Sequence, residues 1–205
     1  MIEVFADVWC PFAHVGLRAV VARRRELGRD DVPLRIRAWP LELVNGQPLD
    51  RHEVADEIAD LRAQVAADLF AAFDERAFPR TSLPALALAS VAYRRSDRTG
   101  EEVSFALRNA LFEEGRDIAD PGVLASIADA HHLDAAGPDD DAAVLADWHD
   151  GQRRDVKGSP HFFCGAISAF CPALVIAKDE NQHLHVRVDP HGLDDFMTRS
   201  LSTGT

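Results

Sequence analysis

The chain has 205 residues, of which 47% are hydrophobic, so it has ample material for a folded core. It carries 34 acidic against 22 basic side chains, and the resulting net charge of -12 repels nucleic acid, which we exclude as a partner. No apolar run approaches the ~20 residues of a membrane-spanning helix, and Met1 leads directly into a strand pattern without a signal segment. We therefore expect a cytoplasmic protein with no membrane partner, and the oligomeric state, a homodimer included, stays open.

The first 40 residues predict a strand, a helix and a second strand. Residues 2–8 alternate in polarity and are rich in Val, Ile and Phe, as in a strand that becomes buried at its end. A helical face begins at Pro11, in the first turn, where the missing N–H of proline costs nothing, and it ends at Gly28. Residues 34–39 alternate again and predict the second strand, which Pro40 closes.

The middle of the chain, residues 50–157, has a helical pattern throughout. The first helix carries an apolar stripe at 3.6-residue spacing, formed by Val54, Ile58, Leu61, Val65, Leu69 and Phe73. Turn and capping residues delimit four further helices, at 83–95, 101–114, 121–130 and 139–155. Strand patterns return at 161–164, 174–177 and 184–188, and a last helix follows Gly192.

A β-α-β beginning and a β-β-α end, separated by helices, predict one α/β domain with a large all-helical insertion. The domain would comprise residues 1–49 and 158–205, and the insertion residues 50–157. Because the two halves of the sheet must meet in space, the loop before His161 is expected to approach Cys10.

Cys10 is the first candidate for chemistry, because it lies between the first strand and the first helix. The unpaired N–H groups and the positive end of the helix dipole stabilise an anion at a helix N-terminus. We therefore expect the pKa of Cys10 to be lowered, which would make it a reactive thiolate. The other cysteines are Cys164 and Cys171, and three cysteines are too few for a disulfide framework.

Pro160 is the second candidate, because it directly precedes a predicted strand. The cis form of an X-Pro bond costs only about 0.5–1 kcal/mol, so the Ser159–Pro160 peptide is a candidate for it. In that arrangement, Ser159 would expose its backbone N–H and C=O groups, which could hold an extended thiol-containing substrate beside Cys10.

With these features the chain resembles the DsbA-like family of thioredoxin-fold proteins, specifically its FrnE-like branch, which is related to 2-hydroxychromene-2-carboxylate isomerases and kappa-class glutathione transferases. The resemblance rests on four segments in the expected order, at residues 7–11, 39–43, 116–120 and 158–163. It implies a thioredoxin-like fold, with the sheet formed by the two ends of the chain. It also implies thiol-disulfide oxidoreductase activity centred on Cys10.

The family pattern Cys-x-x-Cys is incomplete, because Ala13 stands where the resolving cysteine is expected. A single thiol can form a mixed disulfide with a small thiol but cannot complete a dithiol oxidation locally. Cys164 lies roughly 13 Å along the strand from Pro160, beyond the ~7 Å limit for a disulfide. Cys171 could fold back across a hairpin, which the sequence does not decide.

The remaining site residues surround these two segments. We expect Trp9, Pro11, Phe12, Ser159 and Pro160 to bind substrate, with Trp9 mainly packed and Phe12 exposed. His14 and His161 are candidate modulators of the thiolate, although His14 is equally typical of a first-turn surface residue. Cys164 and Cys171 are expected to be small buried hydrophobes. The histidine spacings complete no metal site, so none is expected.

Three functions fit this pattern. The first is a monothiol oxidoreductase that acts on a small-molecule thiol or disulfide, or on a protein disulfide, without a tightly bound cofactor but with glutathione or another low-molecular-weight thiol as partner. The second is a glutathione-type transferase or an isomerase, in which residue 10 assists the thiol of bound glutathione. The third is a non-catalytic binding module.

Overall fold

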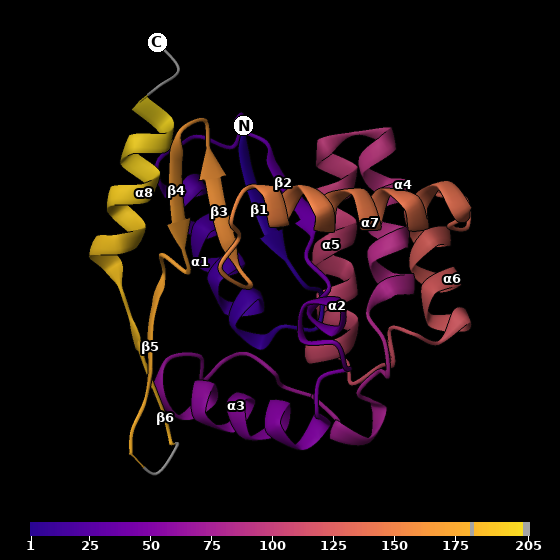
Figure 1. The fold of residues 1–205 in the computed structure, drawn as a ribbon, viewed down its shortest axis with the longest axis horizontal. Helices are drawn as coiled ribbons and strands as arrows, with labels where there is room; N and C mark the ends of the chain where they lie inside the picture. The colour runs from indigo at the N-terminus through magenta and orange to yellow at the C-terminus, as the bar shows by residue number, and fades with distance from the viewer. Residues whose placement is uncertain (181–182, 203–205) are drawn as a thin grey trace.

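A four-stranded sheet with the order β2-β1-β3-β4 forms the centre of the molecule in the computed structural model, which describes residues 1–180 and 183–202 (Figure 1). Its strands are β1 (Ile2–Ala6), β2 (Leu34–Ala38), β3 (His161–Cys164) and β4 (Ile167–Phe170). β1 is parallel to β2 and antiparallel to β3, so the two ends of the chain form one sheet, as predicted. Residues 181–182 and 203–205, which belong to the predicted domain segment 158–205, lie outside the described residues.

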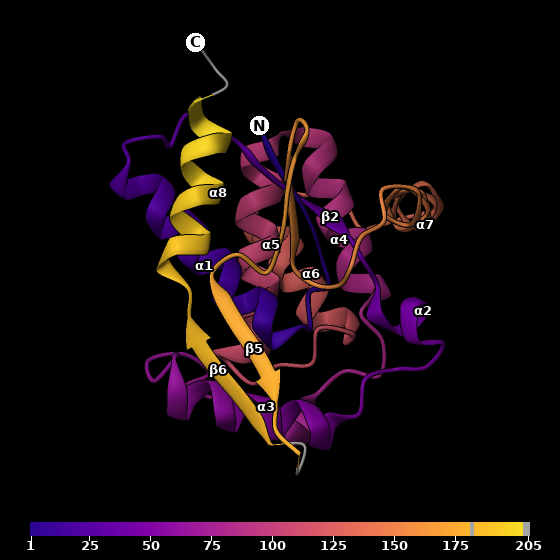
Figure 2. The same cartoon turned by 60° about the vertical axis from the view of Figure 1, so that its left-hand side comes forward.

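The β-α-β beginning is confirmed. α1 (Pro11–Glu26) connects β1 to β2 and buries Leu17 and Val20 against the sheet, in one apolar cluster with Phe196 and Met197 of α8 (Pro190–Ser202). Figure 2 shows α1 and α8 on one side of the sheet and α7 on the other. This arrangement is the thioredoxin-like α/β fold class that the sequence predicts.

The end of the chain corrects the prediction in one respect. The strands expected at 174–177 and 184–188 do not join the main sheet; β5 (Leu174–Lys178) and β6 (Leu184–Val188) form a separate antiparallel pair. The fourth strand of the main sheet is β4, which the sequence pattern does not reveal. β4 has only four residues and follows a tight turn at Gly165, whose φ of 58° suits glycine.

Residues 41–153 are largely helical, and most helices match the prediction. They are α2 (Leu41–Asn45), α3 (Arg51–Gln64), the 3₁₀ helix η1 (Glu75–Ala77), α4 (Leu83–Arg95), α5 (Asp97–Phe112), α6 (Pro121–Ala130) and α7 (Pro138–Arg153). The apolar stripe expected to run to Phe73 is interrupted, because α3 ends at Gln64 and Phe70 adopts a φ of 62°. No helix among the described residues has the length and apolar character needed to cross a membrane.

The helices of 50–157 pack against the sheet and its C-terminal hairpin. α5 and α7 both contact β2, and α3 contacts β6 and α1. The division into a discontinuous domain, 1–49 with 158–205, and an insertion, 50–157, stays a prediction.

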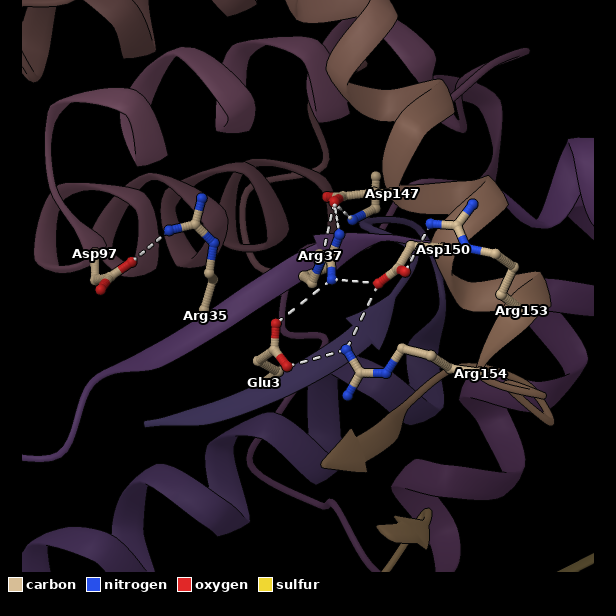
Figure 3. Close-up of polar contacts among 9 residues, drawn as sticks. Glu3, Arg35, Arg37, Asp97, Asp147, Asp150, Arg153 and Arg154 are labelled. Carbon is tan, nitrogen blue, oxygen red and sulfur yellow. Dashed lines mark hydrogen bonds and ion pairs between the residues drawn. The ribbon is translucent and has the colours of Figure 1, made fainter. Parts of the chain in front are cut away.

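An ion-pair network on β2 fixes α7 to the sheet (Figure 3). The guanidinium of Arg37 is 2.6 Å from Asp147, 2.6 Å from Asp150 and 3.5 Å from Glu3 of β1. Arg154, directly after α7, pairs with Glu3 at 3.0 Å and with Asp150 at 3.7 Å. Opposite charges from β1, β2 and the α7 segment therefore pair where α7 crosses the sheet, and we call Glu3, Arg37, Asp147, Asp150 and Arg154 the Arg37 network.

Candidate active site

Cys10 lies at the end of the sheet where α1 begins. It is the N-cap residue of α1, with Pro11 in the first turn, and its side chain is only 4% exposed. Its Sγ–H donates to the carbonyl oxygen of Ser159 at 3.2 Å. The peptide bond between Ser159 and Pro160 is cis. The predicted approach of the Pro160 loop to Cys10 is thus confirmed, and the Ser159 carbonyl expected to face substrate is engaged by the thiol.

Close packing and hydrogen bonds hold the Ser159–Pro160 loop in place. A Cβ added to Gly16 of α1 would lie 3.3 Å from Cγ of Pro160, so the absence of a side chain at Gly16 lets the helix approach the ring. The Ser159 hydroxyl accepts from the backbone N–H of Asp7 at 3.0 Å, and the buried Arg108 donates to the Asp7 carbonyl at 3.1 Å. The end of β1 and the loop are therefore tied to α5.

The predicted lowering of the Cys10 pKa is wrong for this structure. Burial raises the pKa of Cys10 to about 11, although the Ser159 side chain and the Ala13 backbone N–H act in the opposite direction. The negative charges of Glu57 and Asp7 make a smaller contribution to the same rise. Removal of the sulfur from water outweighs the helix N-terminus. In this closed structure Cys10 is a protonated thiol at neutral pH.

Trp9, Phe12 and Pro11 belong to the packed wall of the site. Trp9 is fully buried and stacks on Phe78, with ring centroids 5.5 Å apart and an angle of 10° between the planes, so its predicted packing role is confirmed. Pro11 is buried as well. Phe12 was expected to be exposed but is half-buried, because it packs against both main apolar clusters.

His14 is buried, which corrects the expectation of a surface residue. Its Nε2 is 2.7 Å from Oε1 of Glu113, and its ring packs between Phe70 and Phe112. Burial lowers the pKa of His14 to about 4 in spite of the Glu113 carboxylate. The imidazole is therefore neutral and joins α1 to Glu113 at the end of α5, and Arg18 of α1 also lies within hydrogen-bond distance of its Nε2, at 3.3 Å.

His161 also has hydrogen-bond partners of its own. Its Nδ1 accepts from the backbone N–H of Lys157 at 3.0 Å, and its Nε2 is 3.1 Å from the Ser168 hydroxyl. Burial lowers the pKa of His161. A role of either histidine as a thiolate modulator stays a prediction.

α3 and the β5–β6 hairpin cover the Cys10 end of the sheet, as Figures 1 and 2 both show. The side chain of Gln64, at the end of α3, donates to the carbonyl of Leu184 at 3.0 Å and accepts from the N–H of Val186 at 2.9 Å. This pair of hydrogen bonds locks the helix to the hairpin. We call α3 together with this hairpin the cover.

Two carboxyl groups near Cys10 have strongly altered acidity, and sequence reasoning assigned neither a role. Burial raises the pKa of Asp7 to about 7, against the hydrogen bond that its Oδ2 accepts from Leu41 N–H at 2.5 Å. Burial likewise raises the pKa of Glu57, on α3, to about 7. A sequence signal existed for Glu57, because it lies three residues after Val54 and four before Leu61 on the buried helix face.

The other cysteines differ in position. Cys171, 5% exposed, donates its backbone N–H to the carbonyl of Pro160 at 3.0 Å. Cys164 is half-buried and its Sγ is 3.5 Å from the carbonyl oxygen of Ser200 on α8. Cys171 thus fits the expectation of a buried residue more closely than Cys164. Across the described part of the chain, no group of three or more His, Cys, Asp or Glu side chains is arranged to hold a metal ion.

Comparison with known proteins agrees with this architecture. Residues 1–175 match the family model of the DSBA-like thioredoxin domain. The fold resembles the cytosolic disulfide reductase DsbM from Pseudomonas aeruginosa (17% identity, TM-score 0.63, covering 98% of this chain and 97% of that one). A structure of the same protein with GSH gives 18% identity and a TM-score of 0.56, with 98% of each chain covered.

A 2-hydroxychromene-2-carboxylate isomerase is similar as well, with 16% identity, a TM-score of 0.62 and coverage of 82% of this chain and 87% of that one. Among curated proteins no sequence match was found. The family match spans most of the chain and includes Cys10 and the Ser159–Pro160 loop. The chain therefore belongs to the DsbA-like thioredoxin family.

Proposed function

We propose that the protein catalyses thiol–disulfide exchange at Cys10, with glutathione or another low-molecular-weight thiol as its partner. One observation carries the proposal: the Cys10 sulfur lies 3.2 Å from the backbone carbonyl of Ser159, at the N-terminus of α1 in a DsbA-like domain. The names of the structural neighbours support it, because one is a disulfide reductase and has been solved with GSH. The three free cysteines suit a reducing cytoplasm, which we propose as its location.

The step consists of one exchange. The Cys10 thiolate attacks a disulfide R–S–S–R′, forms the mixed disulfide Cys10–S–S–R and releases R′S⁻. The Ser159 carbonyl, freed from the Cys10 S–H when the proton leaves, then becomes available to a backbone N–H of the substrate. Ala13 offers no sulfur that could attack Cys10–S–S–R and release RS⁻.

Because Cys10 is protonated while it is buried, movement of the cover would change its reactivity. Burial makes the largest contribution to the raised Cys10 pKa, so access of water or substrate to the sulfur removes that contribution. The helix N-terminus and the Ala13 N–H remain, and both stabilise the thiolate. Displacement of the cover by substrate would therefore activate the thiol at the moment of binding.

Mass spectrometry of the intact protein tests the proposal. After incubation of the reduced protein with oxidised glutathione, we expect one glutathionyl group on Cys10. Cys10→Ser should lose the adduct, while Cys164→Ser, which changes a thiol next to α8, should keep it. Absence of both an adduct on Cys10, from glutathione or from another small disulfide, and an internal disulfide that includes Cys10 would contradict the proposal and favour a binding module without chemistry.

A second candidate function is supported by the raised pKa of Cys10. A protonated Cys10 is a hydrogen-bond donor, and it could stabilise the thiolate of bound glutathione as in a glutathione-dependent isomerase or transferase. The similarity to the 2-hydroxychromene-2-carboxylate isomerase supports this reading. Isomerase turnover that survives Cys10→Ser would favour it, because serine also donates a hydrogen bond, whereas complete loss would favour exchange. The FrnE-like and kappa-class relationships stay predictions.

A further inference from the structure

Cys10 and Cys171 flank the same two residues. The Cys10 sulfur is hydrogen bonded to the carbonyl of Ser159, and the Cys171 N–H donates to the carbonyl of the next residue, Pro160. The thiols come from opposite ends of the chain, yet one short loop is shared between them. Each is almost fully shielded from water, with exposures of 4% and 5%.

The environment of Cys171 depends on the charge at Cys10. The hydrogen bonds to two consecutive carbonyl groups place both cysteines against the same loop. Burial and, after it, the negative charge of a Cys10 thiolate raise the pKa of Cys171 to about 12. A thiolate at Cys10 that becomes a disulfide sulfur loses its charge, which removes this obstacle to ionisation of Cys171.

No other cysteine is placed to act with Cys10. Position 13 is Ala13, which is fully buried at the first turn of α1. Cys164 points towards Ser200 of α8. Cys171 therefore stands alone among the described cysteines in bordering the Ser159–Pro160 loop.

Cys171 also borders a groove that Cys10 does not line. This groove, of about 270 Å³, lies between β4 and α8, and Pro172 and Arg199 line it as well. A small thiol bound there would lie next to Cys171.

We propose that Cys171 is the resolving thiol of this active site, an inference that rests on the proposed exchange at Cys10. After Cys10–S–S–R has formed and R′S⁻ has left, the Cys171 thiolate attacks the Cys10 sulfur, forms the Cys10–Cys171 disulfide and releases RS⁻. The substrate disulfide gains two electrons from the two cysteines, and the two protons that the cysteines lose are taken up by the released thiols. Two molecules of a low-molecular-weight thiol then reduce the Cys10–Cys171 bond and leave as their own disulfide.

The test follows the glutathionyl adduct over time in the reduced full-length protein after addition of oxidised glutathione. In the wild type and in the control Cys164→Ser, the adduct should decay into an internal disulfide that peptide mapping assigns to Cys10 and Cys171. In Cys171→Ser, the adduct should persist about ten-fold longer or more, because its resolving thiol is gone. Cys171→Gly should behave in the same way. It is a second test in case serine disturbs the fold, because residue 171 has a φ of 46°, which glycine adopts freely.

Equal adduct lifetimes in the wild type and in both Cys171 variants would overturn the role of Cys171 while leaving exchange at Cys10 intact. An internal disulfide that maps to Cys164 would also overturn it. Failure of Cys10 to form an adduct in any variant would remove the proposed function and this inference together. A Cys10–Cys171 disulfide additionally requires the two Cα atoms to come within about 7 Å, so its mapping in the oxidised wild type is a direct check on the geometry.

Discussion

The Arg37 network and the surroundings of Cys10 differ in how they affect the pKa values of their acidic side chains. In the Arg37 network, burial favours protonation of Asp150, but Arg37 and Arg153 hold its pKa below the ordinary value. Around Cys10, burial dominates, and the pKa values of Asp7 and Glu57 both rise to about 7. The first region uses paired charges to fix α7 to the sheet. In the second region, burial lets Asp7 and Glu57 change protonation state near neutral pH. Such shifted pKa values are typical of catalytic sites.

The largest expected effect concerns the reactivity of Cys10. At pH 8, an unfolded thiol with a pKa of about 8.5 has more than ~100-fold more thiolate than one with a pKa of about 11. Alkylation of Cys10 by iodoacetamide should therefore be slower in the folded protein by about that factor, and the folded rate should keep rising up to about pH 11. Peptide mapping resolves the three cysteines, with half-buried Cys164 as internal reference. If the alkylation rates of Cys10 in the folded and unfolded protein differ by less than ten-fold, Cys10 is not a buried, protonated thiol in the folded protein.

The next prediction compares Phe78 with Phe163, which are both 7% exposed. Phe78 stacks on Trp9 beside Cys10, whereas Phe163 packs edge-on against Phe5 beneath Arg154. Each change to alanine should lower the free energy of unfolding by about 3 kcal/mol. Only Phe78→Ala should also speed alkylation of Cys10 in the folded state, by about ten-fold, because it opens the wall of the site. Equal alkylation rates in the two variants would show that the stacked rings of Trp9 and Phe78 do not limit access to the Cys10 sulfur.

A smaller effect is expected from the charged region. Arg37→Met removes the common partner of three carboxylates and should lower the free energy of unfolding by about 2 kcal/mol in urea titrations. Arg35→Met is the matched control, because Arg35 lies on the same strand but pairs with Asp97 at a more exposed position, and it should cost less than ~1 kcal/mol. If both variants lose a similar free energy of unfolding, the Arg37 network stabilises the fold no more than a surface ion pair does.

The fold was largely predictable because its signals are local. The helix at 121–130 begins and ends as predicted, since the Asp120 carboxylate accepts from the N–H groups of Gly122 and Val123 and Pro121 follows the cap. β4 and the separate β5–β6 pair were not predictable from the pattern. Strand pairing depends on partners far along the chain, and a four-residue strand with alternating exposure has no distinctive run.

The site was predictable in position but not in electrostatics. Topology alone placed the Pro160 loop beside Cys10, because the strands that precede and follow them must pair. The pKa of Cys10 depends instead on how completely the surrounding side chains exclude water, and that packing brings together residues from both ends of the chain. The same packing turned His14 from an expected surface residue into a buried partner of Glu113.

The last prediction isolates the buried carboxyl group of Asp7. Its pKa is about 7 in the folded state and about 3.9 when unfolded, so the folded state binds the proton more tightly. The stability that this group contributes is fully present below about pH 4 and is lost as the pH rises towards 7, with a slope of at most about 1.4 kcal/mol per pH unit. Asp7→Asn removes this slope.

Urea unfolding of the wild type and Asp7→Asn at several pH values between 4 and 8 measures the difference directly. His14 titrates in the opposite sense, because its folded pKa of about 4 lies below the unfolded value, but it is present in both proteins and cancels from the comparison. The same substitution should lower the pKa of Cys10, since the Asp7 charge raises it, and faster alkylation near pH 8 would report that change. A pH-independent difference between the two proteins would mean that Asp7 is ionised throughout this range, and the contrast between the two regions of the sheet would then rest on Glu57 alone.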